Sequence, residues 1–157
     1  MSKSRLFLTL AVLAVMGGLL TACSGDDTTG PSRDWYSAGN ITIRGTFLFD
    51  FDQGGGGNVA MPAGSVADAW WNRLTATTSR LEPQHGATFA SLGKVSFEGV
   101  TWEQVKAAPL STIPLYDIAL GAGTVVAYMT DAGRYGKFMI TGYAGNQDMS
   151  ISWLTWK

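Results

Sequence analysis

The chain has 157 residues, of which 15% are charged, with a formal net charge of −1, one cysteine and one histidine. This length suggests one domain, and the lack of a basic excess argues against binding to nucleic acid phosphates. One cysteine and one histidine fall far short of the four ligands of a structural zinc site, so no metal is expected. The chain has 20 glycines, which with its many Thr, Val and aromatic residues favours β structure with tight turns.

The N-terminus has the pattern of a secretory signal. Lys3 and Arg5 precede an uncharged stretch at 6–20, and small residues follow at 21–22. This order is typical of a signal peptide, and the apolar run is shorter than the roughly 20 residues of a membrane span. An N-terminal core helix is the alternative, but the 3.6-residue alternation of an amphipathic helix is missing. We therefore expect a signal peptide over 1–22.

The residues Leu20-Thr21-Ala22-Cys23 resemble the lipobox of bacterial lipoproteins. The resemblance implies that Cys23 receives a diacylglyceryl thioether and becomes the first residue of the mature chain. Without it, an odd cysteine in a secreted protein would suggest a free thiol or an intermolecular disulfide. Two or more acyl chains anchor a protein stably without a span, so membrane lipid is the first expected partner. In lipoproteins an aspartate directly after the lipidated cysteine favours retention at the inner membrane. Ser24 occupies that position here, so the resemblance implies the outer membrane or cell envelope, on its periplasmic face or at the cell surface.

Residues 23–34 are expected to form a flexible, acylated tether, because they are small and polar and cannot bury enough surface to order themselves. Loss of the signal removes Lys3 and Arg5 and leaves nine basic against twelve acidic side chains, a net charge of about −3. The anchor rather than surface charge would then make the membrane contact. The rest, 35–157, is expected to be a single β-rich domain.

The first strand signal of this domain lies at 41–52, where apolar and polar residues alternate as in a half-buried strand. Leu48 is the exception. The glycines at 54–57 predict an open loop, because consecutive glycines stabilise neither helix nor strand. They also lack the Lys-Ser/Thr pair of a phosphate loop.

Asp50 and Asp52 lie where a calcium loop would start. Counted from Asp50, however, the fifth position is Gly54 and the twelfth is Met61, so two ligands are missing. We therefore expect strand-end carboxylates that face solvent.

The middle of the domain is less regular. Residues 66–82 predict a strand, or two strands joined by a Thr/Ser-rich bend, on which the adjacent Trp70 and Trp71 must point to opposite faces. Residues 87–93 fit a strand or a helical turn. The one clear helix is predicted after Thr101, with Thr101 as N-cap, Gln104 as its capping-box partner and Pro109 as the stop.

Three strand-like runs with short polar connections predict a β-meander at 123–156. In the middle run Phe138 and Ile140 share the face expected to look into the core, and the other face carries Tyr135, Lys137, Thr141 and Tyr143. Trp156 is expected on an outer face with Tyr135 or Tyr143. These patterns predict an all-β fold, mainly an antiparallel sandwich or a barrel-like meander, with one short helix.

The segment YMTDAGRYGKFMI, the closing MSISWLTW and the segment VADAWWNRL are similar to HmuY-like bacterial lipoproteins. The resemblance implies a β-rich fold, and in that family haem is captured by a pair of histidines. His85 is the only histidine here, so one chain cannot build that pair, and Asp68 precedes Trp70 and Trp71 where the family has its acid after the tryptophan. A His85–methionine haem pair is chemically possible, but a solvated loop is the favoured interpretation of His85, and no cofactor is expected.

Catalytic patterns are absent from the sequence. No GxSxG elbow surrounds a serine, and an acylated Cys23 cannot act as a nucleophile. The spacing of the acidic residues is compatible with a glycosidase-like pair of carboxyl groups. The protein is therefore expected not to be an enzyme, and no catalytic residue is assigned.

Aromatic residues are the remaining signal for binding. Six tryptophans are many for this size, and an exposed indole suits a sugar ring or a protein partner. Core packing is the default role for most of them. Two hypotheses follow: a non-enzymatic lipoprotein that binds a small ligand or carbohydrate, or a structural or assembly lipoprotein that docks on an envelope protein. The residues assigned to ligand binding are Trp70, Trp71, Tyr135, Tyr143 and Trp156.

Overall fold

A computed structural model describes residues 34–57, 60–61 and 63–157. The predicted signal peptide, Cys23 and the tether up to residue 33 lie outside the described residues. Asp34 is described: its carbonyl accepts the Lys157 N–H at 3.1 Å, and its Oδ2 pairs with Lys157 Nζ at 3.3 Å. These contacts hold the start and the end of the described chain side by side.

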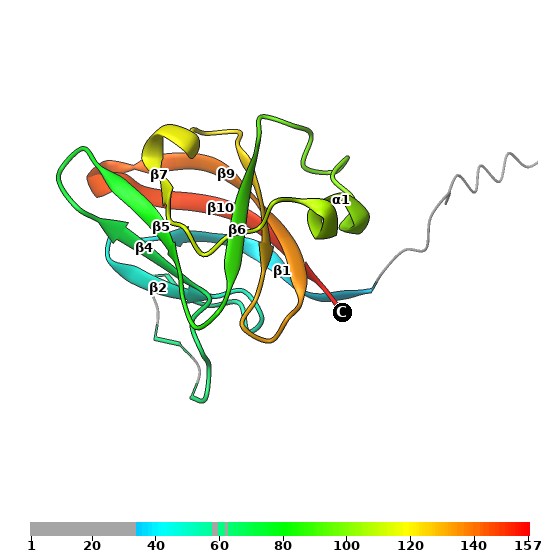
Figure 1. Cartoon of the computed structure of the whole chain (residues 1–157). Helices are drawn as coiled ribbons and strands as arrows, with labels where there is room; N and C mark the ends of the chain where they lie inside the picture. The colour runs from blue at the N-terminus through cyan, green and yellow to red at the C-terminus, as the bar shows by residue number, and fades with distance from the viewer. Residues whose placement is uncertain (1–33, 58–59, 62) are drawn as a thin grey trace, which may run out of the picture. The chain divides into compact units, whose positions relative to one another are not determined.

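The described chain forms two antiparallel sheets and one short α-helix, α1 (Trp102–Ala107), so the predicted all-β fold is confirmed (Figure 1). The first sheet has the strand order β1 (Trp35–Ile43), β10 (Asp148–Trp156), β9 (Tyr135–Ala144), β8 (Val125–Met129) and β6 (Thr88–Gly93). The second sheet has the order β3 (Gly55–Gly56), β2 (Phe47–Asp50), β4 (Ala69–Arg73), β5 (Ser79–Pro83) and β7 (Leu115–Tyr116). Two 3₁₀ turns, η1 (Asp117–Ala119) and η2 (Gly145–Gln147), complete the element order. The meander β8–β9–β10 is as predicted. Of the alternatives left open, the region 66–82 takes the form with two strands, and 87–93 is a strand.

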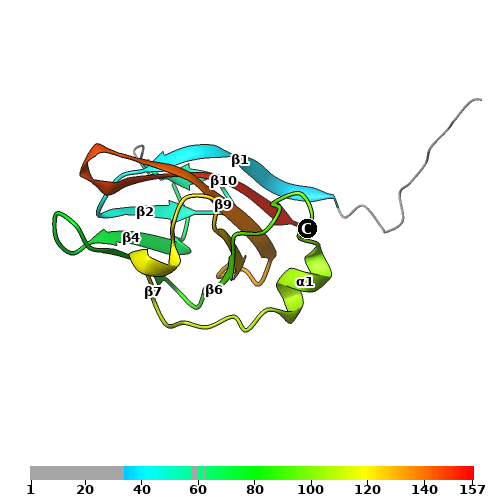
Figure 2. The ribbon, with the colours of Figure 1, turned by 90° about the horizontal axis from the view of Figure 1, so that it is seen from above.

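The two sheets pack face to face around an inter-sheet core (Figure 2). Phe51 lies at its centre, stacked on Tyr128 and Phe138 with ring centroids 4.1 and 5.5 Å away. Phe138 and Ile140 are fully buried, as their parity predicts. Burial of one such side chain stabilises the fold by roughly 1.5–3 kcal/mol.

A second, helix-side core lies on the outer face of the first sheet, where α1 packs against β9. Its buried members are Val100, Val105, Val125, Ala127 and Trp156. The helix begins as predicted: the Thr101 hydroxyl accepts the Gln104 N–H, and the Gln104 side chain accepts the Thr101 N–H. Trp156 lies on the predicted face of β10 but is only 8% exposed. The reason is that the helix covers this outer face and buries it.

Two local predictions for the first strands are wrong. The alternation at 41–52 is divided between β1 and β2 by a turn that the Phe47 N–H closes on the Arg44 carbonyl at 3.1 Å. The predicted open glycine loop is instead a buried hairpin return in which β3 pairs with β2. Gly56 has φ +101°, and a Cβ there would lie 2.3 Å from the Leu48 carbonyl oxygen. The glycines therefore allow close backbone packing rather than an open loop.

Candidate functional site

The five aromatic residues assigned to ligand binding do not form one exposed face. Trp71 is 1% exposed in the inter-sheet core, and Trp70, on the other face of β4, is half-buried. Tyr135 and Trp156 belong to the helix-side core. The structure therefore corrects the aromatic-face prediction, since most of these rings pack in the two cores.

Tyr143 is separated from Tyr135 by a β-bulge. Ile151 pairs with Ile140 and Ser150 pairs with Gly142, so one residue of β9 has no partner and the side-chain alternation is reset. The Tyr143 ring consequently lies 6.1 Å from the Trp71 ring, and its hydroxyl donates to the Leu120 carbonyl. Tyr143 is 42% exposed as a whole residue, and the partial burial of its hydroxyl raises the pKa of Tyr143 to about 12.

His85 lies in the turn between β5 and β6 and is exposed. Its Nδ1 is 2.9 Å from the Ala67 carbonyl oxygen, and its φ is +49°. This arrangement is that of a solvated turn histidine whose ring is oriented by the backbone.

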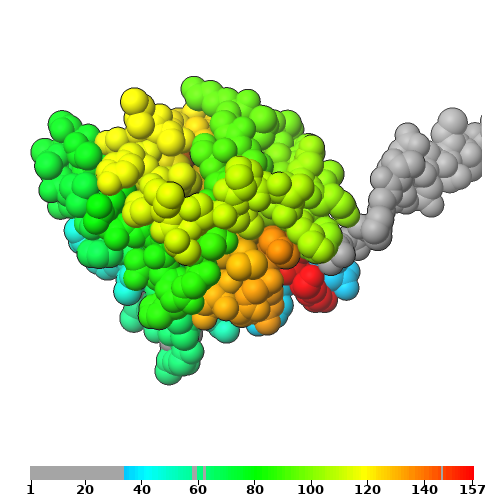
Figure 3. Space-filling model, viewed as in Figure 1, coloured from blue at the N-terminus to red at the C-terminus, as the bar shows by residue number. Residues whose placement is uncertain are grey.

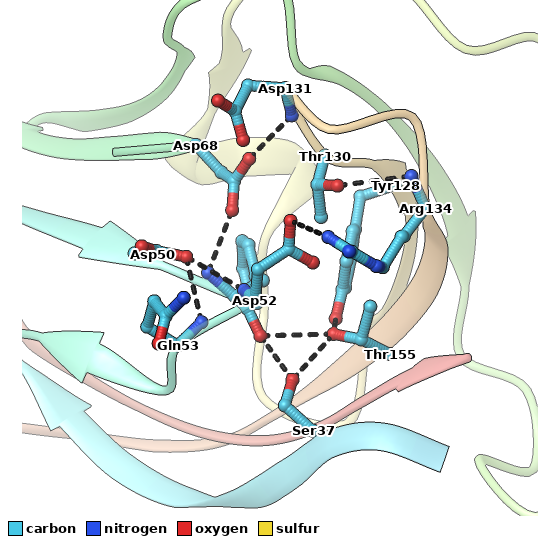
Figure 4. A network of polar contacts seen from close by, with 11 residues as sticks. Ser37, Asp50, Asp52, Gln53, Asp68, Tyr128, Thr130, Asp131, Arg134 and Thr155 are labelled. Carbon is cyan, nitrogen blue, oxygen red and sulfur yellow. Dashed lines mark hydrogen bonds and ion pairs between the residues drawn. The ribbon is translucent and has the colours of Figure 1, made fainter. Parts of the chain in front are cut away.

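The densest polar chemistry is an acidic cluster of Asp52, Asp68 and Asp131, at the end of the sandwich that carries the β2–β3 and β8–β9 turns (Figure 4). One carboxylate oxygen from each residue lies within 4.8 Å of the others. Asp68 is 0% exposed; its Oδ2 accepts the Phe51 N–H at 2.8 Å and its Oδ1 accepts the Asp131 N–H at 2.7 Å. Burial, opposed by these hydrogen bonds, raises the pKa of Asp68 to about 7.

Asp52, a member of this cluster, and Asp50, beside it, are both buried, which corrects the prediction that they face solvent. Asp50 is 2% exposed, and its Oδ1 accepts the N–H groups of Asp52 and Gln53. Asp52 Oδ2 accepts a hydrogen bond from the Arg134 guanidinium at 2.9 Å. Burial raises the pKa of Asp52, although Arg134 and the Thr130 hydroxyl lower it.

Most of the acidic cluster is already engaged in hydrogen bonds, although the buried Asp52 Oδ1 has no hydrogen-bond partner. Both Asp68 oxygens already accept backbone N–H groups, and Asp52 already holds the guanidinium of Arg134. A general acid must reach its substrate, whereas Asp68 has no exposed surface. The cluster therefore ties turns of the two sheets together.

Lys137 is a second buried charge, in the helix-side core. It is 4% exposed, and its ammonium donates to the carbonyls of Phe97 and of Val100, the latter at 2.8 Å. The Nζ atom also lies 4.5 Å from the Phe97 ring centroid and 5.5 Å from that of Trp156. Burial lowers the pKa of Lys137. The lysine thus fixes the segment 97–100 onto β9.

An open surface cavity of about 370 Å³ lies beside this segment, lined by Leu92, Val95, Ser96, Gly99, Val100 and Gln104, of which Val95, Ser96, Gly99 and Gln104 are exposed. Three of its walls are aliphatic side chains, and Ser96 and Gln104 supply the polar groups. Small-ligand sites are commonly mostly apolar hollows of 300–1,000 Å³ with a few polar groups. Val100 links the cavity to Lys137, because its carbonyl accepts the ammonium.

The chain matches no family model, no curated protein and no solved structure. Within the described part, no helix is long and apolar enough to cross a membrane. The functional assignment therefore depends on the sequence and on the sites above.

Sequence reasoning missed Asp68, Asp131, Arg134 and Lys137 as buried or cluster-forming groups, and it missed the cavity. One signal was present: Asp68 is a charged residue inside the otherwise apolar run VADAWW. Charged residues are rarely fully buried unless they are paired, so an acid within a strand-like apolar run marks a candidate for a buried hydrogen-bonded role.

Proposed function

We propose that this protein is a bacterial envelope lipoprotein, anchored through acylated Cys23, whose β domain binds a small apolar ligand without catalysis. The cavity beside α1 carries the binding part of the proposal, because its volume and aliphatic walls suit such a ligand. The lipobox resemblance at Leu20–Cys23 supports the anchor. We therefore expect the ligand to bind at this cavity and not at the aromatic face predicted from the sequence.

The cavity favours a neutral apolar ligand over a sugar. Leu92, Val95 and Val100 offer aliphatic contact, whereas Ser96 already accepts the Gly99 N–H and Gln104 already accepts the Thr101 N–H. A sugar would need many more polar partners, because buried hydroxyl groups without hydrogen bonds are costly. Lys137 contributes by holding the wall segment 97–100 in place.

A matched pair of variants tests the site. Val95 lines the cavity and is 44% exposed, so Val95→Asp places a charge at its mouth without opening the core. Ile118, which is 94% exposed and does not line the cavity, gives the control Ile118→Asp. With N-phenyl-1-naphthylamine as the probe, we expect Val95→Asp to weaken binding at least tenfold and Ile118→Asp to leave it unchanged. Equal probe binding by both variants would show that the probe binds outside the cavity.

Haem belongs in the same titration because the HmuY-like resemblance implies it. A Soret shift that disappears in His85→Ala would assign haem to this chain through its exposed turn histidine. An absent shift, or one that His85→Ala leaves unchanged, would end that part of the proposal.

Docking on an envelope protein is the second candidate function. Ile113, Tyr116 and Ile118, which follow one another on the segment through β7 and η1, are 70%, 46% and 94% exposed. This segment is yellow in Figure 3 and stands on the surface of that view. Apolar residues gathered on one surface mark interaction sites. Crosslinking in cells should then recover a stoichiometric partner from the unaltered protein and lose it in Ile118→Asp; recovery of monomer alone would contradict docking.

The anchor is tested by the mass of the mature protein. We expect a chain that begins at Cys23 and carries a diacylglyceryl group, and a Cys23→Ser variant that keeps its signal peptide and no lipid. An unmodified mature chain would contradict the lipoprotein proposal.

A further inference from the structure

Asp68 connects the two sheets through one side chain. It precedes β4 in the second sheet, and it accepts N–H groups from Phe51, after β2, and from Asp131, in the turn between β8 and β9 of the first sheet (Figure 4). These donors lie 17 and 63 residues away along the chain. The Asp131 hydrogen bond breaks when the β8–β9 turn separates from β4, whereas the Phe51 hydrogen bond joins two segments of the second sheet.

The charges around Asp68 are not balanced. Asp52 and Asp131 place carboxylate oxygens within 4.8 Å, while the Arg134 guanidinium bonds Asp52. Asp68 makes no ion pair with any described residue. The other titratable groups around the cluster are Asp50, Tyr128 and His85. Like charges at this distance in a buried site favour a retained proton.

We propose that the Asp68 carboxyl is a proton-linked latch between the two sheets: the closed form binds a proton that the open form releases, so that raising the pH opens the β8–β9 turn. This role is independent of ligand binding in the cavity. Opening also affects the start of β1, because the Arg134 guanidinium carbon lies 3.8 Å from the Tyr36 ring centroid.

The sign follows from proton linkage. In the closed form the pKa of Asp68 is about 7, and in the open form it returns toward the ordinary value of 3.8. Between these values only the closed form holds the proton, so the opening constant rises by about tenfold per pH unit. Above pH 7 both forms are ionised and the opening constant becomes level.

Amide hydrogen exchange of the full chain, followed by NMR from pH 5 to pH 8 and corrected for intrinsic exchange, measures this opening. We expect the opening constant of the Asp131 amide to rise about fiftyfold from pH 5 to pH 7 and then level off. The Gly45 amide is an internal control, because it donates to Asp148 Oδ1, which belongs to no such carboxylate cluster among the described residues; its opening constant should stay flat. A flat opening constant for Asp131 would overturn the proposal.

Two variants assign the proton. Asp68→Asn keeps one acceptor and removes the titrating group, so the pH dependence should vanish, whereas the matched Asp148→Asn should keep it. His85→Asn should keep it as well, and a dependence that follows His85 instead of Asp68 would overturn the assignment. If Asp68→Asn does not fold, the NMR chemical shifts of the unaltered protein test the assignment instead. The shifts of the Asp68 carboxyl and of the amide that it accepts must then change together over the same pH range.

Discussion

Asp68 and Lys137 bury opposite charges at two places in one small domain, and neither makes an ion pair with a described residue. Two backbone N–H groups hold the carboxylate, and two backbone carbonyls hold the ammonium. Backbone groups are therefore the polar partners of both ionisable side chains. The comparison shows that the same kind of backbone contact accompanies a retained proton at Asp68 and a buried ammonium at Lys137.

The surroundings of the two charges differ. Lys137 lies over the rings of Phe97 and Trp156, whose faces attract a cation. Asp68 instead faces two further carboxylates. Burial disfavours both charged forms, but only the carboxylate meets added repulsion. We therefore expect Asp68 to respond to pH in the neutral range, and Lys137 to act as a permanent clamp there.

The largest expected effect comes from Asp68→Ala. It leaves the buried Phe51 and Asp131 N–H groups without their acceptor, at roughly 1–3 kcal/mol each, so the free energy of unfolding should fall by about 2–5 kcal/mol in urea denaturation. Asp68→Asn, which keeps one acceptor, should lose less. A loss below about 0.5 kcal/mol for Asp68→Ala would show that the two hydrogen bonds do not hold the sheets.

The next effect is the pH dependence of stability. Because the pKa of Asp68 is raised in the folded chain to about 7, the folded chain binds more protons than the unfolded one from about pH 4 to pH 7. The free energy of unfolding should therefore increase as the pH falls from 7 to 5, by up to about 1.4 kcal/mol per unit from this group. Lys137, whose pKa is lowered by burial, adds a slope of the opposite sign where it titrates. Denaturation at pH 5, 6 and 7 checks the sign, and falling stability toward pH 5 would contradict it.

A smaller effect is expected from Lys137→Met. The substitution removes the buried charge and keeps the volume, but it leaves the Phe97 and Val100 carbonyls without the ammonium, so stability should fall by about 1–2 kcal/mol. Exchange of amides in 95–100 should increase, and probe binding should weaken. Lys106→Met is the control, because Lys106 is exposed over the Trp102 ring, and it should change stability by about 0.5 kcal/mol or less.

The smallest effect comes from Asp131→Asn, which keeps the backbone N–H that Asp68 accepts and removes one like charge. Stability at pH 7 should rise by about 0.5 kcal/mol, and the pKa of Asp68 should fall. A pKa of Asp68 that does not move would show that the like charges are not coupled.

The sequence predicted the features that depend on neighbouring residues. The capping box at Thr101 and Gln104 needs only three residues of spacing, and the core face of Phe138 and Ile140 follows from strand alternation. The lipobox interpretation of Cys23 is equally local and stays a prediction.

Features that depend on distant contacts could not be predicted. Asp52 is buried because Arg134, 82 residues later, donates to it, and Trp156 is buried because α1 covers its face. Tyr143 changed sides because one residue of β9 bulges out. The cavity likewise combines residues of β6, the 95–100 segment and α1. Local alternation fixes which face a residue takes, but only the tertiary contacts determine what covers that face.

The most direct test of the account is a ¹³C NMR titration of the Asp68 side-chain carboxyl in the folded protein. The account predicts a single inflection near pH 7, well separated from the exposed carboxylates. An inflection below about pH 5 would show that the two backbone N–H groups fully compensate the buried charge, and would contradict the proton-linked latch.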